Sequence, residues 1–514
     1  MKHWVELLDG LPWHVPPDRF RPPEPDLVVS SVTHDSRQVQ PGALFVAIRG
    51  HRTDGNRHAA EAVAAGAVLV VTDAPERLPA LEAPVVQVPD ARVALAQIAA
   101  RFYDHPAQRL TVIGITGTLG KTSVAEMVAA ILQAAGPAYE PGIIGSLGIR
   151  FRGETRASLL TTPDALTLHR SLAEMAEAGV RVVVMEVTSH AQLQSRVAGL
   201  PFSVACVLNL VPGEHAEIHP TFDHYAAVKL RLLDQLRPGG LLVFNGDDPH
   251  LVGRAGERLG QMPVLAVGKG GRPRRRLPPV PTLLYDGAGP GPLTLTTTGP
   301  YPSLEGERPP ARFSVPLALW GEQNRQNAAA AAAIALALGM SPETVVQGLA
   351  RVRPARRRME PVYEGGFRVL DDTTGHPASF EALFRSLAAV PREGVVLLTA
   401  VRGSRGEAIN RANARAIARW VRDLPIRHVV VTASTEAVHP KDAVQPGEWQ
   451  AFREELAHAG VLAEYHLELE PAVEAALATV RPGEILVLAG AQGLDQATPV
   501  LRRILRQRAA RYQL

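Results

Sequence analysis

The sequence of 514 residues predicts an α/β protein of three domains, the central one built on a parallel sheet. Three observations support this fold class. The chain is too long for one hydrophobic core. Short apolar runs alternate with helical stretches along most of its length. A turn rich in glycine and threonine follows the apolar run at 110–113 and precedes a helical stretch, as in phosphate-binding domains.

The first domain is expected over residues 1–108, where short strands and helices alternate. Strand-like runs lie at 43–48 and 67–72, and helical patterns follow them at 57–65 and 91–103. This order predicts a small α/β domain.

The central domain is expected over residues 109–352. Its expected strands begin at residue 110 and recur at 180–187, 202–210 and 240–245. These strands are runs of β-branched residues separated by helices, which is typical of a parallel sheet covered on both faces. Proline, glycine and arginine are dense at 268–312, which predicts loops and hairpins. The glycine-rich stretch 287–291 lacks a following helix, so it is expected to be a loop with no nucleotide role. An alanine-rich helix at 327–338 closes the domain.

The third domain is expected over residues 353–514, after an arginine cluster at 356–358. Strands alternate with helices again, which predicts a Rossmann-like α/β domain; the expected strands are 367–370, 394–399, 428–432 and 484–489.

Residues 114–123 read Gly-Ile-Thr-Gly-Thr-Leu-Gly-Lys-Thr-Ser and predict a phosphate site. Glycines let backbone amides approach an anion, Lys121 supplies positive charge, and the Thr122 hydroxyl can ligate Mg²⁺ at the helix N-terminus. Ile115 stands where the common loop has its first glycine, so this is a Gly-Thr-x-Gly-Lys-Thr variant. An ordinary turn between strand and helix is the alternative, and nucleotide-driven chemistry is the first hypothesis.

Lysine occurs only at positions 2, 121, 229, 269 and 441, although lysine and arginine total 54. A chain so rich in arginine is expected to keep lysine where arginine cannot substitute. A buried lysine amine can become neutral and nucleophilic, whereas a guanidinium cannot. Lys229 is therefore a candidate functional residue, and the lysines at 2, 269 and 441 are expected on the solvated surface.

The composition argues against several classes of function. A net charge of +3 is small for this length, so no nucleic-acid partner is expected despite a pI near 9.1. Cys206 is the one cysteine and lies in an apolar run, which excludes a disulfide framework and predicts a buried side chain. No basic leader followed by an apolar stretch begins the sequence, and no run of eighteen apolar residues occurs. A cytoplasmic enzyme without membrane insertion is expected.

Metal-ligating residue types follow two strands of the central domain. Glu186 ends one strand at the sheet edge where ligands bind, and is a plausible Mg²⁺ ligand beside the phosphate loop. His215 and His219 are four residues apart, which also suggests zinc, but Glu217 is misplaced for a His-Glu-x-x-His site and no third ligand is obvious. Ordinary helix-surface histidines are the other alternative.

Several motifs together resemble the Mur ligases, specifically the MurE type. They are the loop at 117–122, Thr161-Thr162-Pro163-Asp164, Met185-Glu186-Val187-Thr188-Ser189-His190, Glu214-His215, and Lys229 fourteen residues beyond His215. The resemblance covers essentially the whole chain and implies the three-domain Mur ligase architecture. It also implies an ATP-dependent enzyme that uses Mg²⁺ and joins an amino acid to a UDP-muramoyl-peptide-like substrate, acting as a monomer through an acyl phosphate.

The resemblance assigns roles to individual residues. Glu186 and His215 would hold Mg²⁺ together with Thr122, and a carbamylated Lys229 would orient a second metal. Lys121, Glu186, His215 and Lys229 would be the catalytic residues. The nucleotide would contact Gly117, Thr118, Leu119, Gly120, Lys121, Thr122, Ser123, Asn324, Asn327 and Arg358. The UDP part would contact His34, Ser36, His51, Arg52 and Thr53, and the muramoyl-dipeptide part Thr161, Thr162, Thr188, Gln194 and Arg196.

Departures from the family pattern gather where the incoming amino acid would bind. The Asp-Asn-Pro-Arg of diaminopimelate-using MurE enzymes is replaced over residues 432–436, and the Gly-Lys-Gly-His-Glu stretch reads Gly490-Ala491-Gln492-Gly493-Leu494. Leu119 and Leu160 each replace a customary asparagine. Two interpretations follow: a ligase with an altered acceptor or donor, or a non-catalytic nucleotide- or UDP-sugar-binding paralogue that regulates or scaffolds wall synthesis.

Overall fold

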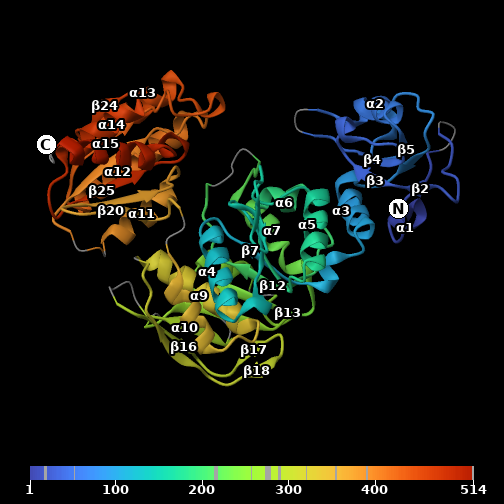
Figure 1. Ribbon diagram of the computed structural model, residues 1–514, viewed down its shortest axis with the longest axis horizontal. Helices are drawn as coiled ribbons and strands as arrows, with labels where there is room; N and C mark the ends of the chain where they lie inside the picture. Colours follow the sequence, from blue (N-terminus) through green and yellow to red (C-terminus); the bar gives the residue numbers. More distant parts are fainter. Residues whose placement is uncertain are drawn as a thin grey trace.

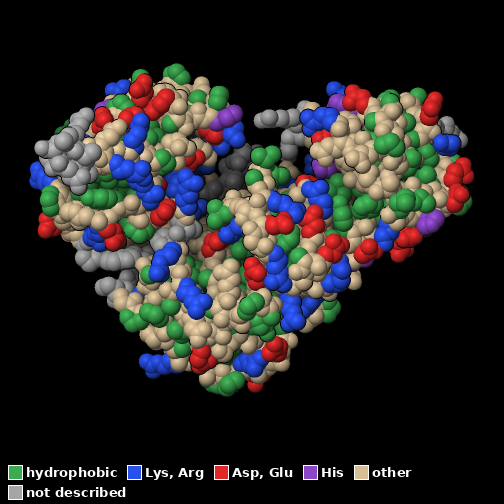
Figure 2. All heavy atoms as spheres, in the orientation of Figure 1, with side chains coloured by type: hydrophobic (Ala, Val, Ile, Leu, Met, Phe, Trp, Pro, Cys, Tyr) green, Lys and Arg blue, Asp and Glu red, His purple; other side chains and the backbone are tan. Residues whose placement is uncertain are grey.

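The computed structural model describes residues 1–16, 20–50, 53–213, 218–255, 258–271, 279–286, 291–319, 321–353, 356–388, 390 and 392–511. It consists of three α/β lobes in chain order (Figure 1). The N-terminal and C-terminal lobes stand on either side of the central one, and the surface is hollowed between them (Figure 2).

The N-terminal lobe is built on a parallel sheet of four strands in the order β3-β4-β5-β6. Its strands are β3 (Ser31–Thr33), β4 (Ala43–Ala47), β5 (Ala67–Thr72) and β6 (Val85–Gln87), beside a ribbon of β1 (Lys2–His3) and β2 (Val28–Val29). Helices α1 (Trp4–Leu8), α2 (Ala59–Ala64) and α3 (Ala91–Phe102) complete it. β4 and α3 lie within a residue of the predicted ranges. The short strands β3 and β6 have too few residues to show periodicity.

The central lobe contains an eleven-stranded sheet in the order β10-β9-β8-β11-β7-β12-β13-β14-β15-β16-β19. Its middle is parallel, from β8 to β15, and every residue of β7's neighbours β11 and β12 is buried. The bounds are β7 (Thr111–Thr116), β8 (Gly142–Gly145), β9 (Gly148–Phe151), β10 (Glu154–Arg156), β11 (Val182–Glu186), β12 (Phe202–Val207), β13 (Leu236–Asn245), β14 (Val264–Lys269), β15 (Thr282–Tyr285), β16 (Leu293–Thr297) and β19 (Arg312–Val315).

The parallel middle confirms the predicted parallel sheet, and antiparallel strands extend it at both edges. One edge is the hairpin series from β8 to β10, where Gly148 turns the chain at a φ of +102°. The predicted hairpins after residue 268 form the other edge, with β17 (Tyr301–Ser303) and β18 (Gly306–Arg308) as a separate ribbon.

Helices cover both faces of the central sheet, which explains why its strands are apolar throughout. One core lies under α4 (Lys121–Ala134), α9 (Glu322–Ala337) and α10 (Pro342–Arg351). The other lies under α5 (Ala165–Glu177), α7 (Phe222–Leu230) and α8 (Pro249–Ala255), while the short α6 (Ser189–Leu193) follows β11.

The C-terminal lobe has a six-stranded sheet in the order β20-β21-β25-β22-β23-β24, parallel except for β20. The bounds are β20 (Glu360–Glu364), β21 (Arg368–Asp372), β22 (Val395–Ala400), β23 (Ile426–Thr432), β24 (Glu464–His466) and β25 (Ile485–Ala489). Cores on its two faces are closed by α11 (Pro377–Ala388), α12 (Glu407–Asp423), α13 (Pro446–His458), α14 (Leu469–Thr479) and α15 (Ala497–Arg511).

Of the lysines expected on the solvated surface, Lys2 lies there in an exposed ion pair, whereas Lys269 is partly buried. Lys269 donates to Glu322 Oε1 at 2.9 Å, and Lys2 pairs with Asp104. Lys441 is exposed as expected, and Cys206 is buried as expected. No helix within the described parts of the chain is long and apolar enough to cross a membrane.

Helices α4 and α10 pack so closely that Gly348 has no room for a side chain. A Cβ at Gly348 would lie 2.3 Å from Ile131 Cα, a backbone atom that cannot rotate away. We expect Gly348→Ala to destabilise the protein by about 1–3 kcal/mol, measured as a lower urea midpoint. Gly253→Ala in α8 is the control, because a Cβ there meets nothing within 4 Å. An equal loss in both variants would contradict this explanation.

Candidate active site

The turn between β7 and α4, predicted to bind phosphate, is shaped by two glycines. Gly117 and Gly120 have φ angles of +149° and +90°, which glycine adopts without strain. A Cβ on Gly120 would lie 2.6 Å from Asn327 Oδ1, so α9 packs directly against the turn. Asn209, after β12, accepts from Leu119 N at 2.8 Å and donates to its carbonyl at 3.0 Å. The loop amides are thereby fixed from two neighbouring elements.

Two lysines converge on this loop. Lys121 Nζ and Lys229 Nζ each donate to the Gly117 carbonyl oxygen at 2.9 Å. Lys229 is only 2% exposed, and its amine lies 4.9 Å from the centre of the Tyr225 ring. Lys229 is therefore not an exposed residue of α7. Two lysine side chains therefore meet at one backbone carbonyl of the phosphate loop.

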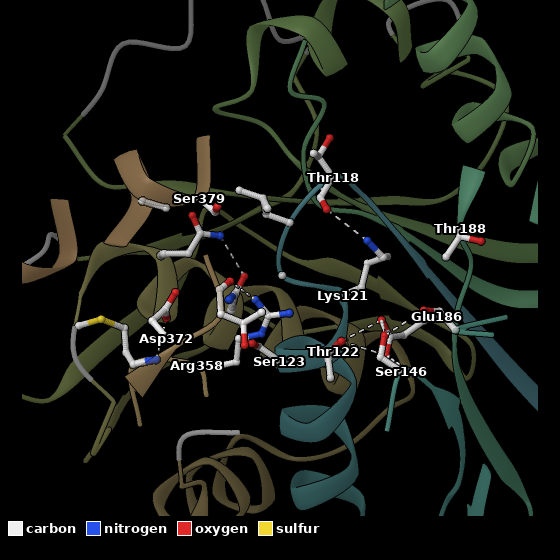
Figure 3. Close-up of a pocket in the computed structure, with 18 of the residues that line it drawn as sticks. Thr118, Lys121, Thr122, Ser123, Ser146, Glu186, Thr188, Arg358, Asp372 and Ser379 are labelled. Atoms are coloured by element: carbon white, nitrogen blue, oxygen red, sulfur yellow. Dashed lines mark hydrogen bonds between the residues drawn. The ribbon is translucent and has the colours of Figure 1, made fainter. Parts of the chain in front are cut away.

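Glu186 is a buried carboxylate at the end of β11. Its oxygens accept from Thr122 Oγ1 at 3.0 and 2.9 Å and from Ser146 N at 2.8 Å. Glu186 and Thr122 therefore place carboxylate and hydroxyl oxygens side by side at the N-terminus of α4 (Figure 3). Hard oxygen donors of this kind suit Mg²⁺. His215, a further predicted metal ligand, lies outside the described residues.

The zinc alternative gains no support from the described part of the chain. Among those residues, no group of three or more histidine, cysteine or acidic side chains could hold a metal ion. His219 is buried against His224 and Tyr225, with ring centres 5.1 Å away in each case, so it is not a helix-surface histidine.

A cavity of about 670 Å³ extends from the phosphate loop toward the C-terminal lobe. In Figure 3, Lys121, Thr122 and Glu186 lie on one side of it and Arg358, Asp372 and Ser379 on the other. Predicted residues that line it are Thr118, Leu119, Gly120, Lys121, Thr122, Ser123, Thr161, Glu186, Thr188, Arg196, Asn324, Asn327 and Arg358.

A second cavity of about 570 Å³ lies between the N-terminal and central lobes. Predicted residues that line it are His34, Ser36, Thr53, Gln194 and Arg196, while His51 and Arg52 lie outside the described residues. Leu160 and Arg196 line both cavities. The structure thus brings the two predicted substrate regions to one shared boundary.

Arg196 lies at this boundary, and its guanidinium bonds neutral groups in the described part of the chain. It donates to Gln194 Oε1 at 3.1 and 2.6 Å and to the Thr162 carbonyl at 2.7 Å, so its described acceptors are uncharged. Burial lowers the pKa of Arg196, although a guanidinium stays protonated. This side chain suits a phosphate or carboxylate.

Three predicted residues lie behind the cavities rather than in them. Thr162 is fully buried and donates to the Glu186 carbonyl at 2.8 Å, Gly117 opens the loop without lining the first cavity, and Lys229 lies under the loop at the Gly117 carbonyl. Sequence reasoning also missed Ser146, Asp372 and Arg405, which line the first cavity. Asp372 comes just after a predicted strand. Its position at a strand end is the sequence signal that could have identified it as a cavity residue.

The departures near the C-terminal sheet edge have structural consequences. Glu436 accepts from Leu469 N at 2.7 Å and thus caps α14. Ser434 is buried and within 3.4 Å of the Thr432 hydroxyl. Residues 432–436 therefore offer no cation at this edge.

The fold and the loop define a nucleotide-dependent α/β enzyme, and comparison with known proteins identifies its family. The chain matches the Mur ligase family catalytic domain over residues 28–103, the Mur ligase middle domain over 115–273, and the Mur ligase glutamate ligase domain over 357–492. It is 31% identical to a UDP-N-acetylmuramoyl-L-alanyl-D-glutamate–2,6-diaminopimelate ligase of Gloeobacter violaceus, covering 91% of this chain and 89% of that protein.

A UDP-N-acetylmuramyl-tripeptide synthetase of Roseiflexus sp. is 35% identical, over 79% of this chain and 76% of that one. Among solved structures, MurF of Acinetobacter baumannii has a TM-score of 0.63 at 22% identity, with 98% and 99% of the two chains covered. A folylpolyglutamate synthase of Mycobacterium tuberculosis, complexed with ADP and AMPPCP, has a TM-score of 0.58 at 18% identity, with 80% and 95% covered. The chain belongs to the Mur ligase family, and the predicted class, an ATP-dependent ligase, is confirmed.

Asp372 generates a prediction about pH. Burial raises the pKa of Asp372 to about 6, although the Arg358 guanidinium and the Met359 amide act in the opposite direction. Between its ordinary value of 3.8 and about 6, the folded state holds a proton that the unfolded state releases. The contribution of Asp372 to stability therefore falls as pH rises through this range. The measurement is the unfolding free energy of the Asp372→Asn variant minus that of the unsubstituted protein. We expect this difference to increase between pH 4 and pH 7, because only the unsubstituted protein loses stability through Asp372. A difference independent of pH would contradict the assignment.

Proposed function

We propose that this chain uses ATP to join an amine to the carboxyl group of a UDP-muramoyl-peptide-like donor. The observation that carries the proposal is the shared boundary of the two cavities at Leu160 and Arg196. A long donor with its nucleotide in the second cavity would cross Arg196 and bring its carboxyl end to the phosphate loop. The names of the curated relatives, which include UDP-muramoyl-peptide ligases, support the same class of donor.

The reaction has two balanced steps. A donor carboxylate oxygen attacks the terminal phosphorus of ATP, ADP leaves, and an acyl phosphate forms. The amine then attacks the acyl carbon, phosphate leaves, and the amine loses a proton as the amide forms. Lys121 and the loop amides stabilise the charge on the transferring group. Asn324, Asn327 and Arg358 are proposed nucleotide contacts, and His34, Ser36, His51, Arg52 and Thr53 hold the UDP part.

We assign Mg²⁺ to Thr122, Glu186, His215 and Lys229. The oxygen pair of Thr122 and Glu186 fits this ion, which when bound neutralises phosphate charge. Lys229 would take part as a carbamate, formed when its amine attacks CO₂ and releases a proton. Its burial beside Lys121 supports this, because a carbamate would replace repulsion between two cations with attraction.

The acceptor is proposed to differ from diaminopimelate, the amino acid named for several relatives. The support is chemical: residues 432–436 contain no arginine, and Glu436 is used as a helix cap. An acceptor without a second carboxylate fits such an edge better. We further propose that the enzyme acts in the cytoplasm, where ATP and UDP-linked donors are made, and acts as a monomer.

The central test is ATP-dependent phosphate release with UDP-muramoyl-dipeptide and a panel of amino acids. We expect release with at least one acceptor that has a single carboxylate. Lys121→Ala should abolish it, since the cation beside the transferring phosphate is lost, and Lys441→Ala should leave it unchanged. Nucleotide binding without phosphate release across the panel would instead support the non-catalytic paralogue.

Lys229 has its own test. We expect Lys229→Ala to lower kcat by at least about 10²-fold, because both the carbamate and the contact below the loop disappear. Short carboxylic acids such as acetate should partly restore this variant if a carboxylate function is what it lacks. Lys121→Ala, which lacks an ammonium instead, should gain nothing from acetate. Equal responses of the two variants would argue against the carbamate.

A further inference from the structure

Arg357 is a buried cation that the proposed reaction does not use directly. It is 6% exposed, and its guanidinium reaches four groups of the C-terminal lobe. Nε donates to Asp371 Oδ1 at 3.0 Å, Nη1 bonds Asp495, and Nη2 bonds the Gly490 carbonyl; both terminal nitrogens also approach the Ala491 carbonyl, at 3.3 and 3.4 Å. Asp371 is in turn fixed by Thr498 Oγ1 at 2.6 Å.

The backbone at Arg357 adopts an unfavourable conformation. Arg357 and Met359 have φ angles of +56° and +52°, in the left-handed region that non-glycine residues rarely occupy. Such conformations persist only where surrounding contacts hold them. Here the contacts are the guanidinium bonds of Arg357 and the bond from Met359 N to Asp372 Oδ2 at 2.8 Å. Arg358 lies between the two strained residues and lines the nucleotide cavity.

The same contacts connect Arg357 to the cavity wall. Thr373 N donates to the Arg357 carbonyl at 2.8 Å, and Arg358 Nη1 lies 3.4 Å from the Thr373 carbonyl. Thr373 and Asp372 both line the cavity. If Arg357 lost its hold, the positions of Arg358 and Asp372 relative to the nucleotide would no longer be fixed.

Two of the groups that Arg357 binds are backbone carbonyls of a turn whose sequence departs from the family pattern at Ala491. The turn after β25 reads Gly490-Ala491-Gln492, without the lysine expected from the Mur ligase resemblance. The carbonyls of Gly490 and Ala491 receive the guanidinium of Arg357 instead. A cation is thus present at this turn, but it comes from a different segment of the chain.

We propose that Arg357 is a positioning residue that ties the segment 357–359 to the 490–492 turn and so holds Arg358 and Asp372 in the nucleotide cavity. The proposal rests on the proposed use of ATP at this cavity. Its effect acts through Arg358 and Asp372, since Arg357 itself does not line the cavity. Loss of Arg357 should therefore weaken nucleotide binding beyond what an equal loss of stability in the C-terminal lobe would cause.

The test measures the Kd of a fluorescent ATP analogue, with the melting temperature recorded for each variant. We expect Arg357→Ala to weaken binding by about tenfold and to raise KM for ATP more than it lowers kcat. Arg427→Ala is the matched control: Arg427 also bonds a buried carboxylate, Glu484, at 2.9 and 2.8 Å, but it lies at the opposite end of the same sheet. The Arg427→Ala variant should have a lower melting temperature and an unchanged Kd for the ATP analogue.

Two further variants separate the guanidinium from the backbone. Arg357→Gly removes strain as well as charge, so it should bind nucleotide as weakly as Arg357→Ala if positioning by the guanidinium is what matters. Asp495→Asn weakens the network at its half-exposed partner and should give a smaller loss in a folded protein even if Arg357→Ala does not fold.

The outcomes are distinct. Affinity in Arg357→Gly and Asp495→Asn equal to that of Arg427→Ala would overturn this proposal while leaving the proposed function intact. Absence of nucleotide binding by the unsubstituted chain would overturn the proposed function and this proposal together.

Discussion

The buried carboxylate of Glu186 is the interaction on which the organisation of the site depends. A charge removed from water is costly unless hydrogen-bond donors surround it. Its donors come from Thr122 at the start of α4 and Ser146 between β8 and β9, while its own carbonyl receives Thr162. Satisfying this single group therefore fixes the phosphate loop, the hairpin edge of the sheet and the start of the segment that leads into α5.

Hydrogen bonds to a partly buried charged group also organise the boundary between the N-terminal and central lobes. Arg196 joins the two cavities, and its bonds to Gln194 and the Thr162 carbonyl hold a guanidinium ready for an anionic ligand. Arg358 enters the first cavity from the opposite lobe. A ligand that contacts both arginines would bridge parts of the chain that are far apart in sequence. Such bridging would stabilise a closed arrangement that excludes water from an acyl phosphate.

Much of the fold followed from local patterns, and the failures have a common cause. β5 was predicted with its observed bounds because its apolar run is long and ends in turn residues. The edge strands β8, β9 and β10 were missed because three or four residues cannot display a period, and their pairing depends on a glycine turn. Lys269 was assigned to the surface because its partner, Glu322, is 53 residues away.

The sequence by itself determined the phosphate loop, the central strands and the scarcity of lysine, because each depends on residue type and spacing within a short segment. It also carried the resemblance from which the family and the candidate residues followed. Only the tertiary structure decided that Thr162 lies behind the cavity, that Lys229 is buried beneath Gly117, and that Arg357 binds the 490–492 turn. These are contacts between distant segments, and their energies depend on burial and geometry that a linear pattern does not contain.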